Sequence, residues 1–327
     1  GDLLASTIDV STGAVSLKLD GTTGDPVTGT YNWSAQTQLD TKSTSTNDSR
    51  SIHLFNSSAN TKLTSFTYSN LTATQKTYFD NLCSGTFKLS QCSSLTAADK
   101  TTANLGSNVI NYLRGQTQFE NTLYRDRVHL LGDIVNATPI YVKSAPFQYV
   151  DNDYSSFITA QQNRAATVYS AANDGMLHAF DGVTGNELWA YIPSMVLSNL
   201  YKLADNDYAN KHQYYVDASP TVADVYVPTG NGNNNAWKTI LVGGLNAGGK
   251  GLYAIDVTDP GNPKGLWEFT DTDMGYTFGN PVVTRLVTGE CVVLISSGLN
   301  NVSNGDGVGR LYVLNAADGS IKYKIST

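Results

Sequence analysis

Apolar residues recur in the second half of the chain as short runs that appear three times in the same order. Each copy holds a leucine, an aromatic or histidine residue, two apolar positions, and an Asp or Asn that is soon followed by glycine. Each copy then ends on an aromatic residue. The repeat positions are Leu177, Asp181 and Trp189, then Leu252, Asp256 and Trp267, then Leu311, Asn315 and Tyr323. A unit that recurs in this way predicts a repeat architecture.

Further apolar runs precede each copy and complete a unit of four short strands. These runs cover residues 167–171, 239–243 and 292–296, and a segment led by Pro139, Pro220 or Pro281 comes before each. Four short strands with short connections form one antiparallel blade of a β-propeller. Both sides of the predicted strands are apolar, as in a sheet that is packed between neighbours. The predicted fold class is therefore all-β dominated, a propeller of four-stranded antiparallel blades.

The polar residues inside the repeat have structural explanations. An Asp or Asn that closes a strand just before a glycine is ordinary turn chemistry, because its side chain bonds its own backbone and the glycine allows positive φ. His178 occupies the position that Tyr253 and Tyr312 hold in the other copies. We interpret the repeat acids and this histidine as structural rather than catalytic.

Three units do not close a ring, because propellers normally have about four to eight blades. The chain starts without an initiator Met and stops directly after a predicted strand, so we expect it to be a piece of a longer protein. We divide it at residue 130. Residues 131–327 would hold at least three blades of an incomplete ring, and residues 1–130 a β/α region that leads into the propeller and decorates it.

The N-terminal region lacks the repeat and has short helical signals instead. We expect a β-like segment over residues 8–19 and an exposed polar loop over residues 41–49. A Thr-x-x-Gln capping box predicts a helix over residues 73–82. Apolar residues near helical spacing predict a second helix over residues 97–113, ended by Gly115.

The composition chiefly argues against nucleic acid as a partner and against a membrane span. Only 15% of the residues are charged and the net charge is −7, which does not suit binding to nucleic acid. No segment is long and apolar enough to span a bilayer. The abundance of Thr, Ser, Asn, Gly and Tyr is typical of exported bacterial surface proteins.

The three cysteines divide into a close pair and a single residue. Cys83 and Cys92 would form a loop-closing disulfide in an oxidising compartment, and two free thiols are the alternative. Cys291 lies in an apolar strand, where a free thiol packs as a small hydrophobe.

Candidate metal ligands are limited to three short acidic clusters. Calcium needs six to eight oxygen ligands, usually from alternating Asp and Asn in one loop. Each cluster is equally explained as a solvated loop, because none has the glycine and distal carboxylate of an EF-hand. The candidates are Asp151 with Asp153, Asp205 with Asp207, and Asp271 with Asp273.

Catalytic signals are weak. The four histidines are scattered, and neither a Gly-x-Ser-x-Gly elbow nor a His-Glu-x-x-His motif occurs. Arg125, Asp126 and Arg127 are expected to form an ion-pair network with Asp133 that anchors the first blade, without a chemical role.

Several segments together resemble the PilY/PilC family of type IV pilus proteins. They occur in the family's order and cover roughly residues 110–327, whereas residues 1–109 are only weakly similar. The matching segments are Tyr112–Gly115, Tyr124–Val142, Tyr169–Asp181, Glu187–Pro193, Asp256–Pro260, Leu266–Thr270 and Met274–Pro281.

The resemblance implies a quinoprotein-like propeller near the C-terminal end of an exported protein of a Gram-negative bacterium. Such proteins lie at the pilus tip or outer surface, promote pilus assembly against retraction, and often mediate adhesion. Implied partners are minor pilins, other tip subunits, and a receptor on a host cell or abiotic surface. No cofactor is visible in the sequence. Calcium remains possible, because family members often carry a calcium loop just after the point where this chain stops.

Two other functions stay open. Quinone-dependent dehydrogenases have a similar repeat, but they also need a closed ring and usually adjacent cysteines, which this chain lacks. A propeller that serves only as a protein-docking scaffold is the second alternative. We expect a non-enzymatic pilus protein.

Overall fold

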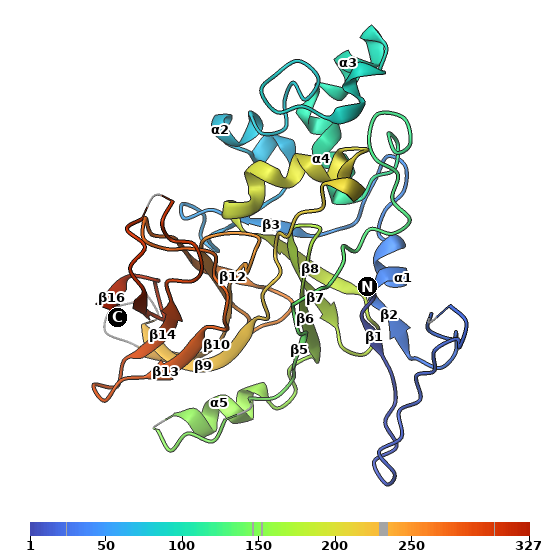
Figure 1. The fold of residues 1–327 in the computed structure, drawn as a ribbon. Helices are drawn as coiled ribbons and strands as arrows, with labels where there is room; N and C mark the ends of the chain where they lie inside the picture. Colours follow the sequence, from blue (N-terminus) through green and yellow to red (C-terminus); the bar gives the residue numbers. More distant parts are fainter. Residues whose placement is uncertain (24, 146, 152, 229–234, 304) are drawn as a thin grey trace.

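The computed structural model describes residues 1–23, 25–145, 147–151, 153–228, 235–303 and 305–327. In this part of the chain the strands form three large sheets and one two-stranded sheet. Helices α2, α3 and α4 gather on one side of the sheets, and α5 lies on the opposite side (Figure 1). The helices are α1 Ala35–Asp40, α2 Ala73–Lys76, α3 Ala97–Ala103, α4 Gly106–Arg114 and α5 Tyr154–Gln161, with 3-10 turns η1 Tyr68–Asn70, η2 Ser90–Ser93, η3 Ser194–Ala204 and η4 Tyr208–Asn210.

The second and third blades are four-stranded antiparallel sheets, as the repeat predicts. Their strand orders are β12-β11-β10-β9 and β13-β14-β15-β16. Each begins directly after the proline expected to lead it. The second blade comprises β9 Thr221–Pro228, β10 Asn235–Gly243, β11 Leu252–Asp256 and β12 Lys264–Phe269; the third comprises β13 Val282–Arg285, β14 Cys291–Ser296, β15 Arg310–Asn315 and β16 Ile321–Ser326.

The first blade has six strands rather than the predicted four. Its repeat strands are β5 Ile140–Val142, β6 Thr167–Ala172, β7 Met176–Asp181 and β8 Glu187–Ile192. The hairpin of β3 (Ile52–Phe55) and β4 (Leu63–Ser65) extends this sheet, and β3 pairs parallel to β8, with Ile52 opposite Ala190. The extra hairpin covers the hydrogen-bonding edge of β8, which would otherwise be open. The division at residue 130 remains a prediction, although residues 52–65 belong to the sheet of the first blade.

A repeated tryptophan contact joins successive sheets. The Trp189 indole Nε1 donates a hydrogen bond to the Pro260 carbonyl at 2.7 Å, and that of Trp267 donates to the Ala316 carbonyl at 3.0 Å. In both pairs the tryptophan comes from the fourth strand of one blade and the carbonyl from the third-strand turn of the next. Both indoles are buried, so each contact adds a large apolar area to one directed bond.

The same contact occurs once more, at a place that the sequence repeat did not indicate. Trp33 lies in β2 (Trp33–Ser34), which pairs with β1 (Leu4–Ala5) ahead of the first blade. Its Nε1 donates to the Gly182 carbonyl at 3.3 Å. A Cβ at Gly185 would lie only 2.6 Å from the Trp33 ring, and this glycine also has φ of +74°. The two-stranded sheet therefore docks on the first blade as a preceding blade would.

Tyr323, the final aromatic of the third copy, is placed differently from the tryptophans. It is 57% exposed, whereas Trp189 and Trp267 are buried. Ile321 and Ile325 on the same strand are also exposed. Within the described residues no sheet covers this face, so Tyr323 lacks the contact that its counterparts make.

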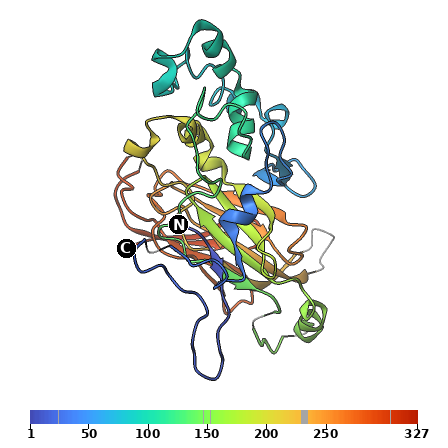
Figure 2. The same ribbon diagram turned by 90° about the vertical axis from the view of Figure 1, so that its right-hand side faces the viewer.

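The N-terminal residues differ from the sequence expectation. Between β1 and β2, residues 8–19 were expected to be β-like, but the described part has only the isolated bridges Ile8–Val15 and Leu19–Pro26. Both views show this arm projecting away from the sheets (Figures 1 and 2). Val10 is 97% exposed, so the arm buries too little apolar surface to complete a sheet. The loop 41–49 was expected to be exposed, yet the Asp48 side chain is buried against Arg114.

Both predicted helices exist but are shorter than expected. The capping box of Thr72 and Gln75 is present, yet α2 ends at Lys76 rather than near residue 82. The helix predicted over residues 97–113 is broken into α3 and α4, because the Gly106 amide donates to the Asp80 carboxylate at 3.1 Å instead of continuing the helix. Gly115, with φ of +116°, ends α4 as predicted.

Cys83 and Cys92 form a disulfide, and Cys291 is a buried free thiol. The bridge closes a loop on the helical side of the molecule.

Trp267→Ala tests the blade contact. We expect it to lower the free energy of unfolding by about 3–5 kcal/mol, because the change removes a buried indole from between two blades. Urea unfolding of the purified chain would measure this loss. Tyr323→Ala is the matched control and should have little effect, since Tyr323 is exposed. Equal midpoints for Trp267→Ala and the unsubstituted chain would contradict the assigned contact.

Candidate functional site

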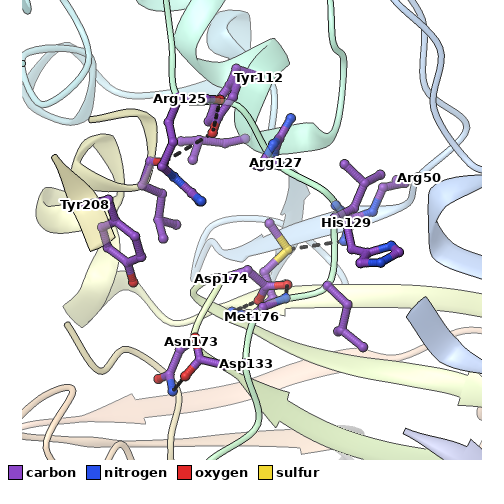
Figure 3. Close-up of a pocket in the computed structure, with 15 residues that line it drawn as sticks. Arg50, Tyr112, Arg125, Arg127, His129, Asp133, Asn173, Asp174, Met176 and Tyr208 are labelled. Carbon is purple, nitrogen blue, oxygen red and sulfur yellow. Dashed lines mark hydrogen bonds between the residues drawn. The ribbon is translucent and has the colours of Figure 1, made fainter. Parts of the chain in front are cut away.

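A cavity lies where the helical region meets the first blade. Its volume is ≈ 160 Å³. Its walls come from α4, from residues 125–133, from the β6–β7 turn and from η3 with η4. Charged side chains dominate this wall, and Figure 3 shows Arg125 pointing into the space between Tyr208 and Asp174. This junction is therefore the candidate site.

The floor of the cavity is a buried network of four charged residues. Arg50 binds Glu187 through two parallel hydrogen bonds of 2.8 Å each. His178 donates from Nδ1 to Glu187 at 2.8 Å and from Nε2 to Asp174 at 3.0 Å. The side chains of Arg50, Glu187 and His178 are at most 2% exposed. The network therefore joins the entry to β3, through Arg50, to the β7 and β8 strands of the first blade.

The charges of His178 and Glu187 are stabilised by their partners rather than by water. Burial lowers the pKa of His178, but the nearby carboxylates of Asp174 and Glu187 outweigh it and raise that pKa to about 9. Burial raises the pKa of Glu187, but Arg50 and His178 outweigh it and hold that pKa well below its usual range. His178 is thus an imidazolium at neutral pH, with both ring nitrogens donating.

Two further ion pairs fasten the helical region to this junction. Arg114, at the end of α4, pairs with Asp48 and also donates to the Phe66 carbonyl at 2.9 Å. Arg127 pairs with Glu120, and its guanidinium lies 3.7 Å from the centre of the Tyr112 ring.

The predicted network of Arg125, Asp126 and Arg127 with Asp133 does not form. Arg127 pairs with Glu120 instead, and Asp133 accepts from Asn173 at 2.9 Å and lies 3.1 Å from His212. Arg125 donates from Nε to the Leu203 carbonyl at 2.9 Å and covers the Tyr208 ring at 4.9 Å. The prediction was wrong because Glu120, the Leu203 carbonyl of η3 and Asn173 of the β6–β7 turn supply the partners instead.

A pairing of Ser or Cys with His does not occur among the described residues that line the cavity. Both nitrogens of His178 are engaged by carboxylates, so neither is free to act as a base. No Ser, Thr or Cys is found among the described residues that line the cavity. The arrangement holds two parts of the molecule together, and its one guanidinium without a carboxylate partner in the described structure belongs to Arg125.

The repeat residues lie in turns and at contacts between blades. Asp181 accepts from the Val183 and Thr184 amides at 3.0 and 2.8 Å, which is the turn role expected from the sequence. Asp256 and Asn315 make the corresponding bonds in the later blades. Leu177 and Leu252 are buried, and Leu311 is half-buried.

The six acidic metal candidates lie in three separate pairs. Most of them form ion pairs with Lys or Arg side chains. Asp271 and Asp273 both receive Lys324, at 2.8 and 2.7 Å. Asp207 pairs with Lys211 at 2.7 Å, and Asp151 pairs with Arg285.

The other two candidates, Asp205 and Asp153, have local roles. Asp205 accepts from the Ser90 amide at 3.0 Å, and Asp153 is the N-cap of α5. The described residues contain no group of three or more His, Cys, Asp or Glu that could hold a metal ion. Six to eight oxygens are thus not assembled here, and no calcium ligand is assigned.

Comparison with known proteins identifies the family. A family model described as the PilY1 beta-propeller domain matches residues 131–327. The chain belongs to the PilY1 β-propeller domain family.

Related proteins have names that agree with this family match. The type IV pilus biogenesis factor PilY1 of Pseudomonas aeruginosa PAO1 is 41% identical over 232 residues, which cover 67% of this chain and 19% of the relative. The factor of the same name from strain UCBPP-PA14 is 36% identical, covering 83% of this chain and 22% of its own length. A PilY1 homolog of Xylella fastidiosa is 38% identical, with 68% and 19% covered. The chain thus spans about a fifth of the length of these relatives.

One solved structure is also similar. The crystal structure of the P. aeruginosa PilY1 C-terminal domain shares 37% identity, covers 57% of this chain and 36% of that chain, and has a TM-score of 0.45.

Sequence reasoning missed the main features of the PilY1-family junction. It did not pair Arg50 with Glu187, which lie 137 residues apart. The only signal was an isolated Arg ahead of an apolar strand, together with a Glu at the start of another.

Within the described residues, no helix of this propeller module is long and apolar enough to cross a membrane.

Arg50→Met tests the buried pair. We expect a loss of about 3–5 kcal/mol in the free energy of unfolding, because Glu187 keeps its buried charge without its strongest partner. Urea unfolding near neutral pH would measure this loss of free energy. Lys322→Met removes one side of the exposed pair with Glu290 and is the control, with no appreciable loss expected. Comparable losses in both variants would show that the Arg50 pair is not specially important.

The raised pKa of His178 predicts a pH dependence. A raised folded-state pKa stabilises the fold below the unfolded value of about 6.5, and this contribution is lost as pH rises through about 9. The difference in unfolding free energy between the unsubstituted chain and His178→Gln should therefore shrink by about 3 kcal/mol between pH 6 and pH 10. Urea titrations at several pH values would reveal this change. Parallel pH profiles for the two proteins would show that His178 is neutral in the fold.

Proposed function

We propose that this chain is the propeller module of an exported type IV pilus biogenesis factor, and that it acts without catalysis in pilus assembly and surface attachment. The observation that supports it best is 36–41% identity to biogenesis factors named PilY1 over two thirds or more of the chain. The matched region includes the entire repeat. Assembly follows from the names of these relatives, whereas attachment is the further step of the proposal.

The structure favours binding over catalysis. Rigid blades carry loops and a helical layer, and a rigid scaffold with variable loops is the usual basis for protein recognition. The buried charged groups of the junction are engaged in contacts between segments, as the two bonded nitrogens of His178 illustrate. Its cysteines are a disulfide and one buried thiol, unlike the adjacent cysteines expected of a quinone dehydrogenase.

The partners we propose are minor pilins or other tip subunits, together with a receptor on a cell or abiotic surface. The disulfide suits an exported protein, since such bonds persist mainly in oxidising compartments. Calcium binding stays part of the proposal only for the longer protein, because the described residues do not assemble a ligand set.

Gene deletion in the source organism tests the proposal. Strains lacking the whole gene, or only the segment for residues 131–327, are scored for surface pili and for attachment, each with retraction intact and blocked. Loss of pili that returns when retraction is blocked is the expected result for an assembly role. Normal pili with poor attachment would restrict the role to adhesion.

Protein amounts must be measured in each strain, so that loss of the factor is not mistaken for loss of one module. Complementation with the full gene should restore both phenotypes, and so should a gene carrying Lys264→Gln, a change at an exposed residue of the second blade. Unaltered pili and attachment in both deletion strains would overturn the pilus function. A quinone chromophore in the purified protein would then favour the enzyme alternative.

A further inference from the structure

A second cavity adjoins the junction, and Tyr208 lines both. Its volume is ≈ 470 Å³, compared with ≈ 160 Å³ for the first. Sites for small ligands are typically about 300–1,000 Å³, so only the second has room for one. We name it the lysine pocket, for its lining by Lys88, Tyr201, Lys202, Tyr208, Lys211 and Gln213.

Two of the three lysines have no carboxylate partner among the described residues. Lys211 is neutralised by Asp207 at 2.7 Å. Lys202 is half-buried and donates only to the Gln213 amide oxygen, at 3.1 Å. Lys88 is exposed and makes no hydrogen bond or ion pair in the described structure. In a chain of net charge −7, two ammonium groups that line one cavity without a carboxylate partner favour an anionic ligand.

The acidic residue of the lining is already occupied. Asp205 accepts from the Ser90 amide at 3.0 Å, from the Ser90 hydroxyl, and from the Asp207 amide at 2.8 Å. These bonds direct its oxygens to the wall rather than to a ligand. His212 also lines the cavity, and its Nε2 lies 3.1 Å from the Asp133 carboxylate.

Neutral groups of the lining suit a hydroxylated ligand. The Tyr201 hydroxyl and the side-chain nitrogen of Gln213 have no hydrogen-bond partner among the described residues. The Tyr208 hydroxyl donates to the Gln213 carbonyl at 3.3 Å, which fixes the ring beside the cavity. The Tyr201 hydroxyl and the side-chain nitrogen of Gln213 can therefore form hydrogen bonds with the hydroxyls of a sugar.

The disulfide loop makes the pocket rigid. Lys88 lies between Cys83 and Cys92, and the neighbouring Gln91 donates to the Leu123 and Ala204 carbonyls at 2.9 and 3.0 Å. The Phe87 ring packs 5.2 Å from that of Tyr201. The backbone of the loop is therefore fixed to the end of η3, which holds Lys88 beside the pocket.

We propose that the lysine pocket binds an acidic sugar, a hexuronate residue whose carboxylate lies between Lys88 and Lys202. An acidic peptide fits less well, because turns and a disulfide loop form the lining and offer no free strand edge for main-chain pairing. Such binding would supply the attachment part of the proposed function. It is measured on the purified chain, so its failure leaves the assembly role untouched.

Isothermal titration of the purified chain with short oligomers of galacturonate tests the proposal. The oligomers should bind saturably and more weakly at high salt, because charge pairs contribute. The methyl-esterified oligomers have the same ring without the charge and should bind at least about tenfold more weakly. Lys88→Gln and Lys202→Gln should each weaken binding of the acid about tenfold, since each loses a charge-assisted bond. Lys264→Gln, far from the pocket on β12, should bind as the unsubstituted chain does.

Three results would overturn the proposal. These are absence of saturable binding to the acidic oligomers, equal binding of acid and ester, and unchanged affinity in both pocket variants with folding verified by their urea midpoints. Binding of an acidic peptide in place of the sugar, lost in Lys88→Gln, would also overturn it and make the pocket a protein-docking site.

Discussion

An indole that reaches from one sheet into the turn of the next is the contact on which this fold depends. A four-stranded blade cannot cover both of its faces, so its stability depends on its neighbours. The contact couples a large apolar area to a hydrogen bond and so fixes both the distance and the rotation between blades. Gly319 allows the close approach, since a Cβ there would lie 2.7 Å from the Trp267 ring.

The buried ion pairs have a different role, the attachment of a polar N-terminal region to the sheet of the first blade. The β3–β4 hairpin supplies hydrogen bonds along β8, but a strand edge alone specifies register poorly. The bidentate pair of Arg50 with Glu187 has one acceptable geometry, because a shifted register would leave both charges buried and unpaired. We infer that the pair fixes the register in which this hairpin joins the first blade.

The features that sequence predicted well are local and repeated. The strands of the blades, the turn roles of Asp181 and its counterparts, the end of α4 at Gly115 and the disulfide all follow from short patterns. The β3–β8 pairing and the docking of Trp33 join segments more than a hundred residues apart and have no period to reveal them. The division of one helix into α3 and α4 depends on the Asp80 carboxylate, which lies outside the helical pattern. The lysine pocket was missed for the same reason, because Lys88, Lys202 and Gln213 come from separate segments.

The disulfide contributes both to the fold and to the pocket. A bridge that closes a short loop would gain little by stabilising a surface turn that touches nothing. Here the loop is bound at Gln91 to the end of η3 and at Ser90 to Asp205, so constraining it also constrains the wall of the lysine pocket. The polar N-terminal region thus has a structural reason to be ordered despite its low apolar content. Arg50, Arg114 and Arg127 are paired with carboxylates where this region meets the propeller, whereas Lys88 of this region and Lys202 of η3 have no carboxylate partner among the described residues.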